Sequence, residues 1–303
     1  MYLFSKFEIE SLKDLSSIYL PSELRGWELK KNYTKLNGVS ISNLVSTYCS
    51  TNRKIYQLNK GIDYGQSEAM IFGSAIHAIV EKIYEAMLRY SDNTDELQRS
   101  LNKLKEENVL TSLIWNGDKL QALHDLSPND IEYELKLEKI KETMRDLIDY
   151  EIERFTDPNL YNEVRILDLE RYVNGNSLSI GTGKIDVIFR YKESLGIGDL
   201  KTGKMWKDNH DSKVQITVYA MLLEAEIKRK IDWGVVIFPF EINDGNRNLK
   251  ATPFKDIFPI SSELRMEVIE RFDEIEGLLQ GNHSPEICYK CKTKSICLQE
   301  VSL

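Results

Sequence analysis

Two short segments in the second half of the chain bring acidic and basic side chains together at the spacing of a β-strand. Asp186 lies within the apolar run IDVIF, and Asp199 and Lys201 are two residues apart further along. Side chains two apart on a strand point to the same face, so Asp199 and Lys201 share a face and Leu200 points to the other. If the two segments pair as a hairpin, Asp186 comes to lie beside Asp199.

Two carboxylates and one lysine in this arrangement predict a site for a hard divalent cation. Like charges at short range repel each other unless a cation lies between them. Carboxylate oxygens are the preferred ligands of Mg²⁺ and Mn²⁺, and the neighbouring lysine can position or deprotonate an attacking water or hold a phosphate. An isolated Asp-x-Lys triplet is more often an ordinary surface ion pair, so this interpretation depends on the residues around it.

Three residues elsewhere in the chain fall where such a site can use them. Gln215 and Tyr219 are four apart and therefore share one face of a predicted helix. Both can hydrogen-bond to a phosphate or to the lysine, and a tyrosine can stack on an unpaired base. His77 leans over Gly73 because helical side chains tilt towards the preceding turn, and the glycine leaves space against the imidazole. Taken singly, each has an ordinary reading as part of a half-buried helix face or as a buried histidine.

Lysines follow the acidic segment closely. Lys204, Lys207 and Lys213 are expected to form a local basic rim in a chain whose formal net charge is −8. Residues 198–204 also match most of a phosphate-binding loop, but Met205 stands where a Ser or Thr must supply a hydroxyl to Mg²⁺. The sequence therefore disfavours a nucleotide triphosphatase.

The four cysteines belong to one pattern. Cys288, Cys291 and Cys297 form C-x2-C-x5-C near one end of the chain, and Cys49 lies near the other. The chain shows no export signal, which makes a disulfide framework a poor interpretation. Four thiolates suit either structural Zn²⁺ or a [4Fe–4S] cluster, and the spacing alone leaves the metal open. In either case Cys49 must meet the C-terminal segment, so the centre would join the two ends of the chain.

Composition places the chain among globular proteins. It has 303 residues, of which 29% are charged and 42% are apolar, enough for one large domain or two modest ones. No apolar run approaches the ~18–20 residues that a membrane span needs, and the first residues lack the features of a signal peptide. A cytoplasmic location without membrane contact is the expectation. The acidic balance disfavours coating of nucleic acid by bulk charge but permits a local basic groove.

The elements that must position these residues follow from periodicity and turn chemistry. Helices are predicted from Ser40 to near Cys49 and over residues 68–90, 213–228 and 261–279, with further helical patches in 94–155. Strands are predicted over residues 164–173, 179–191, 195–201 and 232–240, with a hairpin signal at Asn174-Gly175-Asn176. Residues 1–40 are expected to be irregular or to form short helices. This order predicts an α/β (mixed α+β) protein with helices on both faces of a mixed sheet.

In combination, these residues resemble the RecB-like branch of the PD-(D/E)XK nuclease superfamily. The likeness is greatest to its iron–sulfur members, the CRISPR-associated RecB-like exonucleases and the exonuclease V family. The elements that carry it run through residues 41–298 in the family's order: Gly73 to His77, Gly183 to Asp186, Asp199-Leu200-Lys201, Gln215 to Tyr219, and Cys49 with Cys288, Cys291 and Cys297. Ile185 stands where many members have proline. The 109 residues from His77 to Asp186 exceed the separation in compact members and indicate a helical insertion.

The resemblance implies a fold and a division of the chain. The fold is a restriction-endonuclease-like core in which helices flank a mixed sheet. The division comprises an N-terminal helical region (1–93), a helical insertion (94–158), the nuclease core (159–280) and a cysteine-bearing segment that packs back on the N-terminal region (281–303).

The resemblance also implies an activity and its residues. The expected activity is metal-dependent hydrolysis of DNA phosphodiesters, by an exonuclease acting on single-stranded ends. His77, Asp186, Asp199 and the main-chain carbonyl of Leu200 would hold Mg²⁺ or Mn²⁺. Lys201 would activate or position the water, Gln215 and Tyr219 would hold the substrate, and the four cysteines would bind a [4Fe–4S] cluster.

The expected binding partners and two alternative functions follow from the same residues. DNA is the expected partner, with proteins of CRISPR adaptation or of recombination and repair as further candidates. The rival hypothesis is a non-catalytic scaffold that binds DNA ends and keeps the fold and the cluster. A zinc-stapled binding module is a third alternative.

Overall fold

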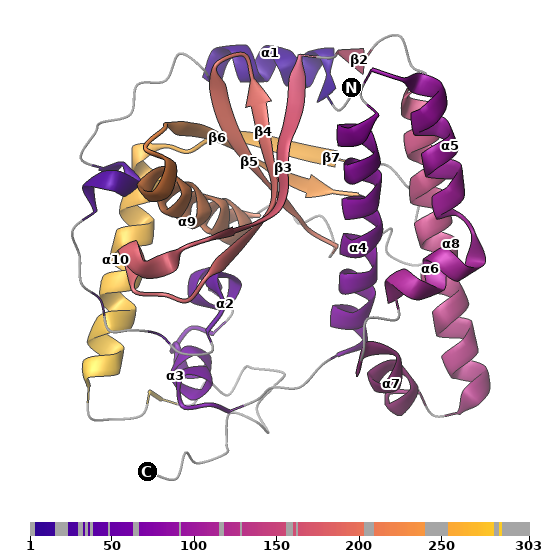
Figure 1. Cartoon of the computed structure of the whole chain (residues 1–303). Helices are drawn as coiled ribbons and strands as arrows, with labels where there is room; N and C mark the ends of the chain where they lie inside the picture. Colours follow the sequence, from indigo (N-terminus) through magenta and orange to yellow (C-terminus); the bar gives the residue numbers. More distant parts are fainter. Residues whose placement is uncertain are drawn as a thin grey trace.

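A five-stranded mixed sheet forms the centre of the protein (Figure 1). The computed structural model describes residues 4–15, 24–29, 33, 36, 39–47, 49–62, 67–90, 92–114, 118–127, 129–155, 160–161, 163–202, 209–239, 254–281 and 285–286. The strands, in sheet order, are β3 (Val164–Val173), β4 (Gly183–Tyr191), β5 (Ser194–Leu200), β6 (Ile231–Phe238) and β7 (Phe254–Pro259). β5 and β6 run parallel, and the other neighbours run antiparallel.

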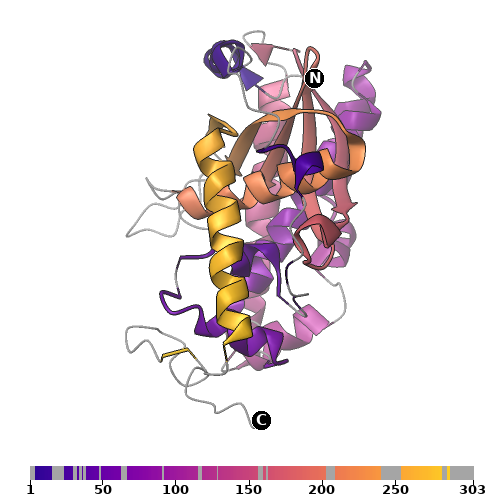
Figure 2. The ribbon, with the colours of Figure 1, turned by 90° about the vertical axis from the view of Figure 1, so that its left-hand side faces the viewer.

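Helices cover both faces of this sheet (Figures 1 and 2). On one face α4 (Glu68–Arg89) packs against the sheet. The helices α5 (Thr94–Leu104), α6 (Glu107–Ile114), α7 (Asp118–Asp125) and α8 (Asp130–Phe155) pack on the outer side of α4. On the other face lie α2 (Ile41–Val45), α9 (His210–Ile227) and α10 (Ser262–Gln280). Two apolar cores result, one on each side of the sheet, as expected for a fold with helices on both faces.

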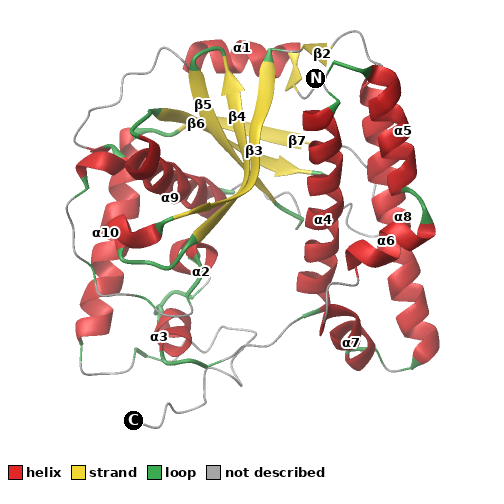
Figure 3. Cartoon of the chain, viewed as in Figure 1, coloured by secondary structure: helices red, strands yellow, loops and turns green. Residues whose placement is uncertain are grey.

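Smaller elements close the ends of this body (Figure 3). They are α1 (Lys6–Leu15), α3 (Arg53–Asn59), the two-stranded pair of β1 (Phe4–Ser5) with β2 (Leu160–Tyr161), and the 3₁₀ turns η2 (Gly26–Glu28) and η3 (Gly175–Leu178). In the part of the chain that the structure describes, no helix combines the length and apolar character that a membrane crossing requires.

Helix α4 shows how the local sequence forms its element. The Ser67 side chain accepts a hydrogen bond from the Met70 main-chain N–H, which caps the first turn. Ile76, Ile79 and Ile83 recur at helical spacing and are at most 1% exposed. This buried stripe fixes the rotation of α4 and therefore decides where the polar residues between the isoleucines point.

The hairpin of β4 and β5 brings the two acidic segments together. Lys192 and Glu193 form the turn, and Lys192 adopts a left-handed backbone with a φ of 53°, as two-residue hairpin turns require. Val187 pairs with Gly198 across the hairpin. The next position on each strand is Asp186 or Asp199, so the register sets these two residues opposite each other.

A buried ion network joins elements that are far apart in the sequence. Glu224 on α9 is fully buried, and its carboxylate accepts hydrogen bonds from Arg25 at 2.8 Å and from Arg265 at 2.7 and 3.0 Å. The main-chain N–H groups of Gly26 and Ile231 donate to the same carboxylate at 2.9 and 3.0 Å. The network therefore ties η2, α9, β6 and α10 together with every carboxylate oxygen engaged.

Several expectations about local elements were wrong, each for a local physical reason. β3 and β4 do pair as an antiparallel hairpin, but the Asn174 side chain accepts from the Asn176 N–H at 2.9 Å and starts the 3₁₀ turn η3, so β4 begins at Gly183 instead of residue 179. The helix predicted from Ser40 ends at Val45, before Cys49.

Strand β7 was not predicted, and neither were the short strands β1 and β2. β7 has six residues, lies at the edge of the sheet and begins with the exposed Phe254. Its burial does not alternate strictly, so it lacks the period of two by which a half-buried strand is recognised. The predicted division of the chain into four regions stays a prediction.

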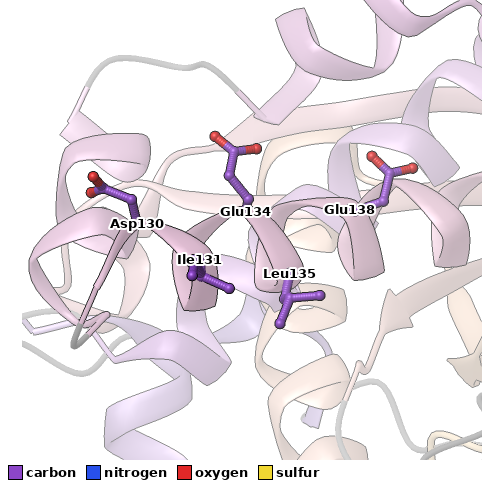
Figure 4. Close-up of a pocket in the computed structure, with 5 residues that line it drawn as sticks. All are labelled: Asp130, Ile131, Glu134, Leu135 and Glu138. Atoms are coloured by element: carbon purple, nitrogen blue, oxygen red, sulfur yellow. The ribbon is translucent and has the colours of Figure 1, made fainter.

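An apolar strip lies on the outer surface of the helical layer, at the start of α8 (Figure 4). Ile131 is 74% exposed and Leu135 is 68% exposed, and Asp130, Glu134 and Glu138 flank them on the same helix. The five residues line a shallow surface depression that belongs to one helix. It contains none of the residues singled out for chemistry.

Candidate active site

The candidate site lies where β4, β5 and α4 meet. Asp186 on β4 accepts a hydrogen bond from the main-chain N–H of Leu200, the last residue of β5, at 2.7 Å. His77 on α4 places its Nδ1 atom 3.8 Å from Asp186 Oδ2. The main chain of Leu200 also hydrogen-bonds to the His77 imidazole and favours its protonated form. Three separate elements therefore converge on the end of β5.

Asp199 and Lys201 join this group from the other side of Leu200. Lys201 Nζ lies 2.7 Å from Asp199 Oδ2 and donates a hydrogen bond to Gln215 Oε1 at 2.9 Å. Gln215 Nε2 donates to Asp199 Oδ1 at 3.1 Å and to the Tyr219 hydroxyl at 3.3 Å. The α9 residues therefore clamp both members of the Asp199–Lys201 ion pair in one hydrogen-bonded chain.

Burial and mutual repulsion dominate the electrostatics of the site. Burial, with the charge of Asp199 second, raises the pKa of Asp186 from 3.8 to about 7. Burial, followed by the same charge, also raises the pKa of Tyr219. Burial lowers the pKa of His77 against the opposing effect of Asp199. Two carboxylates therefore stand close together at a partly buried place, and a bound cation would relieve their mutual repulsion.

The donor set matches what a hard cation prefers, although the side chains are not gathered into a complete shell. Asp199 is 3% exposed, and its Oδ2 atom accepts no hydrogen bond of normal geometry beyond its ion pair with Lys201. Among the described residues, no three His, Cys, Asp or Glu side chains already stand close enough to hold a metal ion. A cation at this place would combine the two carboxylates with main-chain oxygen, which suits Mg²⁺ and Mn²⁺.

The glycines of these segments allow close approaches. A Cβ atom on Gly73 would lie 2.7 Å from Thr202 Oγ1, so the space beside His77 on α4 receives the residue that directly follows Lys201. A Cβ atom on Gly183 would lie 3.1 Å from Tyr219 Cε1. Both glycines thus let neighbouring elements pack closely at the site.

The structure brings the predicted polar set together. The residues that meet are His77, Asp186, Asp199, Leu200, Lys201, Gln215 and Tyr219. Gln215 is 6% exposed and Tyr219 is 8% exposed, so they face the carboxylates and the lysine instead of an open surface. Their predicted contact with substrate stays a prediction.

Lys213, one of the three lysines of the predicted basic rim, contacts residues of β7. Lys213 pairs with Asp256 at 2.9 Å and lies 5.4 Å from the centroid of the Phe258 ring. It is therefore engaged with β7. Lys204 and Lys207 lie outside the described residues.

Cys49 is the cysteine of the predicted metal centre that lies among the described residues. Cys49 is half-buried, and its Sγ accepts from the Lys54 main-chain N–H at 3.4 Å. Cys288, Cys291 and Cys297 lie outside the described residues. Arg53 donates to the carbonyl of Pro285 at 2.8 Å, so the chain three residues before Cys288 lies against the start of α3.

Lys184, which stands two residues before Asp186 on β4, was not among the predicted site residues. Its charge lowers the pKa of both Asp186 and His77, and it forms an ion pair with Glu170 on β3. The sequence did contain an indication of this role, because residues two apart on a strand share a face and Lys184 therefore lies on the same face as Asp186.

One family model and one curated relative match most of the chain. The family described as CRISPR-associated exonuclease Csa1 matches residues 3–301. The CRISPR-associated exonuclease Csa1 of Saccharolobus solfataricus strain P2 is 26% identical over 280 residues, which cover 89% of this chain and 88% of the relative. A crystal structure of a candidate exonuclease from Eubacterium rectale is 12% identical with a TM-score of 0.43, over 95% of this chain and 96% of that chain.

Proposed function

The chain belongs to the Csa1 family of CRISPR-associated exonucleases and is on that ground a nuclease; we propose that it hydrolyses DNA phosphodiesters with a divalent metal, starting from single-stranded ends. The observation that carries this proposal is the convergence of two like-charged aspartates, Asp186 and Asp199, with Lys201 at the end of β5. Such an arrangement has no structural need, because two carboxylates held together at a partly buried place repel each other and cost stability.

The ligands of the metal follow from the donors available. We propose that Asp186, Asp199, the Leu200 carbonyl and His77 hold Mg²⁺ or Mn²⁺ in a PD-(D/E)XK-type site. The ion would supply Lewis acidity to the scissile phosphate and lower the pKa of the attacking water. Because Leu200 N–H already holds Asp186 at 2.7 Å, one carboxylate is oriented before any ion arrives.

Lys201 stands where an ammonium group can position the attacking water and take part in its proton transfer. The ion pair with Asp199 and the hydrogen bond to Gln215 fix its ammonium at two points. A fixed ammonium beside the phosphate can position the water, take part in proton transfer and offset the negative charge that develops. Gln215 and Tyr219 support this role as positioning residues, because their contacts in the structure are to Asp199, Lys201 and each other.

The test compares cleavage and binding in one variant. Asp199→Asn should lower cleavage of end-labelled single-stranded DNA in Mg²⁺ or Mn²⁺ by at least ~100-fold, the scale of losing one electrostatic catalytic group. Asp168→Asn is the matched control, because Asp168 is also a strand aspartate that pairs with a cation, Arg171 at 3.2 Å. Near-normal cleavage by Asp199→Asn would show that the assignment of the site is wrong.

Cleavage and binding assays of the parent protein distinguish the nuclease from the non-catalytic scaffold. If the parent cuts neither single- nor double-stranded ends with any divalent ion, yet binds them, the non-catalytic hypothesis replaces this proposal. EDTA should abolish cleavage by the parent, because the proposed reaction needs the ion.

We further propose that Cys49 and the three C-terminal cysteines hold a [4Fe–4S] cluster. The contact of Arg53 with Pro285 supports this proposal, because it brings the chain that leads to Cys288 towards the Cys49 loop. Arg271 on α10 strengthens the same junction by donating to the Ser46 carbonyl at 3.1 Å.

Iron and sulfide analysis of anaerobically purified protein tests the cluster. Cys49→Ser should lose the iron and lower the thermal midpoint, since metal binding is coupled to holding the two ends of the chain together. Ser50→Ala, one residue away, should keep both. Stoichiometric zinc without iron in the parent would replace the cluster by a zinc staple.

A further inference from the structure

Beside the candidate site, an exposed tyrosine and a lysine form a pair across two strands. Tyr172 on β3 and Lys184 on β4 are direct partners in the antiparallel ladder. Tyr172 is 68% exposed, and Lys184 Nζ lies 5.9 Å from the centroid of its ring. Side chains directly opposite in a ladder stand on the same face of the sheet. The pair therefore presents an aromatic surface and a positive charge together.

This pair adjoins the carboxylates of the proposed reaction. Lys184 and Asp186 are two apart on β4, so they share a face and their Cα atoms are about 7 Å apart. That separation is close to one nucleotide step of an extended strand. The ring of Tyr219 packs on Gly183, the neighbour of Lys184. No part of this pair belongs to the proposed metal ligands.

A strained residue holds the lysine in place. Glu170 on β3 has a φ of 51°, a left-handed backbone within a strand, which costs a residue other than glycine on the order of 1 kcal/mol. Its carboxylate forms an ion pair with Lys184. An ammonium has three N–H donors, so Lys184 can keep Glu170 and still donate to a further acceptor.

We propose that Tyr172 and Lys184 form a nucleotide subsite for the strand that the enzyme cuts. The ring of Tyr172 stacks on an unpaired base, and the ammonium of Lys184 binds a phosphate next to the scissile one. The subsite rests on the proposed nuclease function and names a substrate contact for it. Stacking on an aromatic ring tolerates any base, which suits an enzyme that must proceed along a strand of arbitrary sequence.

Equilibrium binding of labelled single-stranded DNA in Ca²⁺ measures the subsite without cleavage. Tyr172→Ala should weaken binding by about 5- to 150-fold, the range for loss of one stacked base, and Tyr172→Phe should bind like the parent. The matched control is Tyr90→Ala, because Tyr90 also has a cation beside its ring, with Arg89 Cζ 6.0 Å from the ring centroid. Tyr90 lies ~20 Å along α4 from His77 and is therefore far from the site. Equal binding by Tyr172→Ala and the parent would overturn the subsite.

A substrate lacking one base gives the more specific test. An abasic position placed at the stacked nucleotide should weaken binding to the parent as Tyr172→Ala does, and the two changes together should cost no more than either alone. Scanning the abasic position from the end of the strand locates the nucleotide. If the two losses multiply at every position, Tyr172 acts on the fold and not on a base, and the subsite is refuted.

Salt dependence tests the lysine. Lys184→Gln should reduce the slope of log K against log salt by about 0.7, the value for one phosphate contact on a single strand. Lys192→Gln, at the other end of the same hairpin strand, should leave the slope unchanged. An unchanged slope for Lys184→Gln would show that Lys184 does not contact a phosphate.

The two proposals fail in different ways. A parent that cuts DNA, with Tyr172→Ala and Lys184→Gln binding and cutting like it, overturns the subsite and leaves the nuclease function standing. A parent that binds DNA through Tyr172 without cutting it overturns the catalytic function alone. A parent that does not bind single-stranded DNA overturns both.

Discussion

Asp186 should make the metal-free protein less stable as the pH rises. Burial and the charge of Asp199 raise the pKa of its carboxyl from 3.8 to about 7. Between these two values the folded protein keeps a proton that the unfolded chain has released. Because the folded state binds more protons, the free energy of unfolding decreases with increasing pH in this interval. The loss is complete once the pH exceeds the folded-state pKa.

The size of the effect follows from the two pKa values. Between pH 5 and pH 8, ionising such a group costs the folded state about 2.5 kcal/mol at 1.36 kcal/mol per pKa unit. The Asp186 side chain is 21% exposed, so water screens part of this penalty. We therefore expect the contribution of Asp186 to be about 2 kcal/mol over this interval.

Urea unfolding in EDTA, followed by circular dichroism at pH 5 and pH 8, measures this contribution. The parent should lose about 2 kcal/mol more than Asp186→Asn over the interval. Asp92→Asn, which alters an exposed aspartate beyond the end of α4, should follow the parent. Parallel pH profiles for the parent and Asp186→Asn would refute the reasoning. At pH 8, Mg²⁺ should stabilise the parent and not Asp186→Asn, because only the parent keeps the proposed ligand.

Two further substitutions test packing. Glu224→Ala should lower the free energy of unfolding by about 3–5 kcal/mol, because it removes the carboxylate that Arg25 and Arg265 share and leaves Arg25 with Asp232 alone. A loss below about 1 kcal/mol in urea unfolding would contradict the network. Gly73→Ala should slow cleavage by about 10- to 100-fold by displacing Thr202 and the neighbouring Lys201, to which we assign the attacking water. Adding Thr202→Ala to that variant should restore the rate in the same assay, whereas equal rates for Gly73→Ala and the parent would show that this approach is not tight.

The fold class and most of the elements could be predicted because their signals are local. The isoleucines of α4 repeat at helical spacing, and the strands on either side of Lys192 carry apolar runs, so both were expected before any packing was known. The Asp199–Lys201 pair and the Gln215–Tyr219 pair are each set by the period of one element. Membership of the Csa1 family and the mixed fold agree with the resemblance inferred from these motifs.

Contacts between elements that are far apart in the sequence could not be predicted from local sequence patterns. Arg25 and Glu224 are 199 residues apart and meet only because η2 packs on α9. The burial of Tyr219 could not be predicted for the same reason, since it depends on Gly183 and the sheet behind it.

The sequence by itself determined which chemistry is available, because the spacing of Asp199 and Lys201 on one strand is a matter of covalent geometry. Tertiary structure alone decided which residues stand beside that chemistry. The pairing of β3 with β4 shifts register between Ile166 and Asp168, and this irregularity sets Tyr172 opposite Lys184. A shift of one residue turns every later side chain of a strand to the other face of the sheet. The strand sequence does not reveal such an irregularity, because its energy depends on the partner strand and on the helices that pack against both.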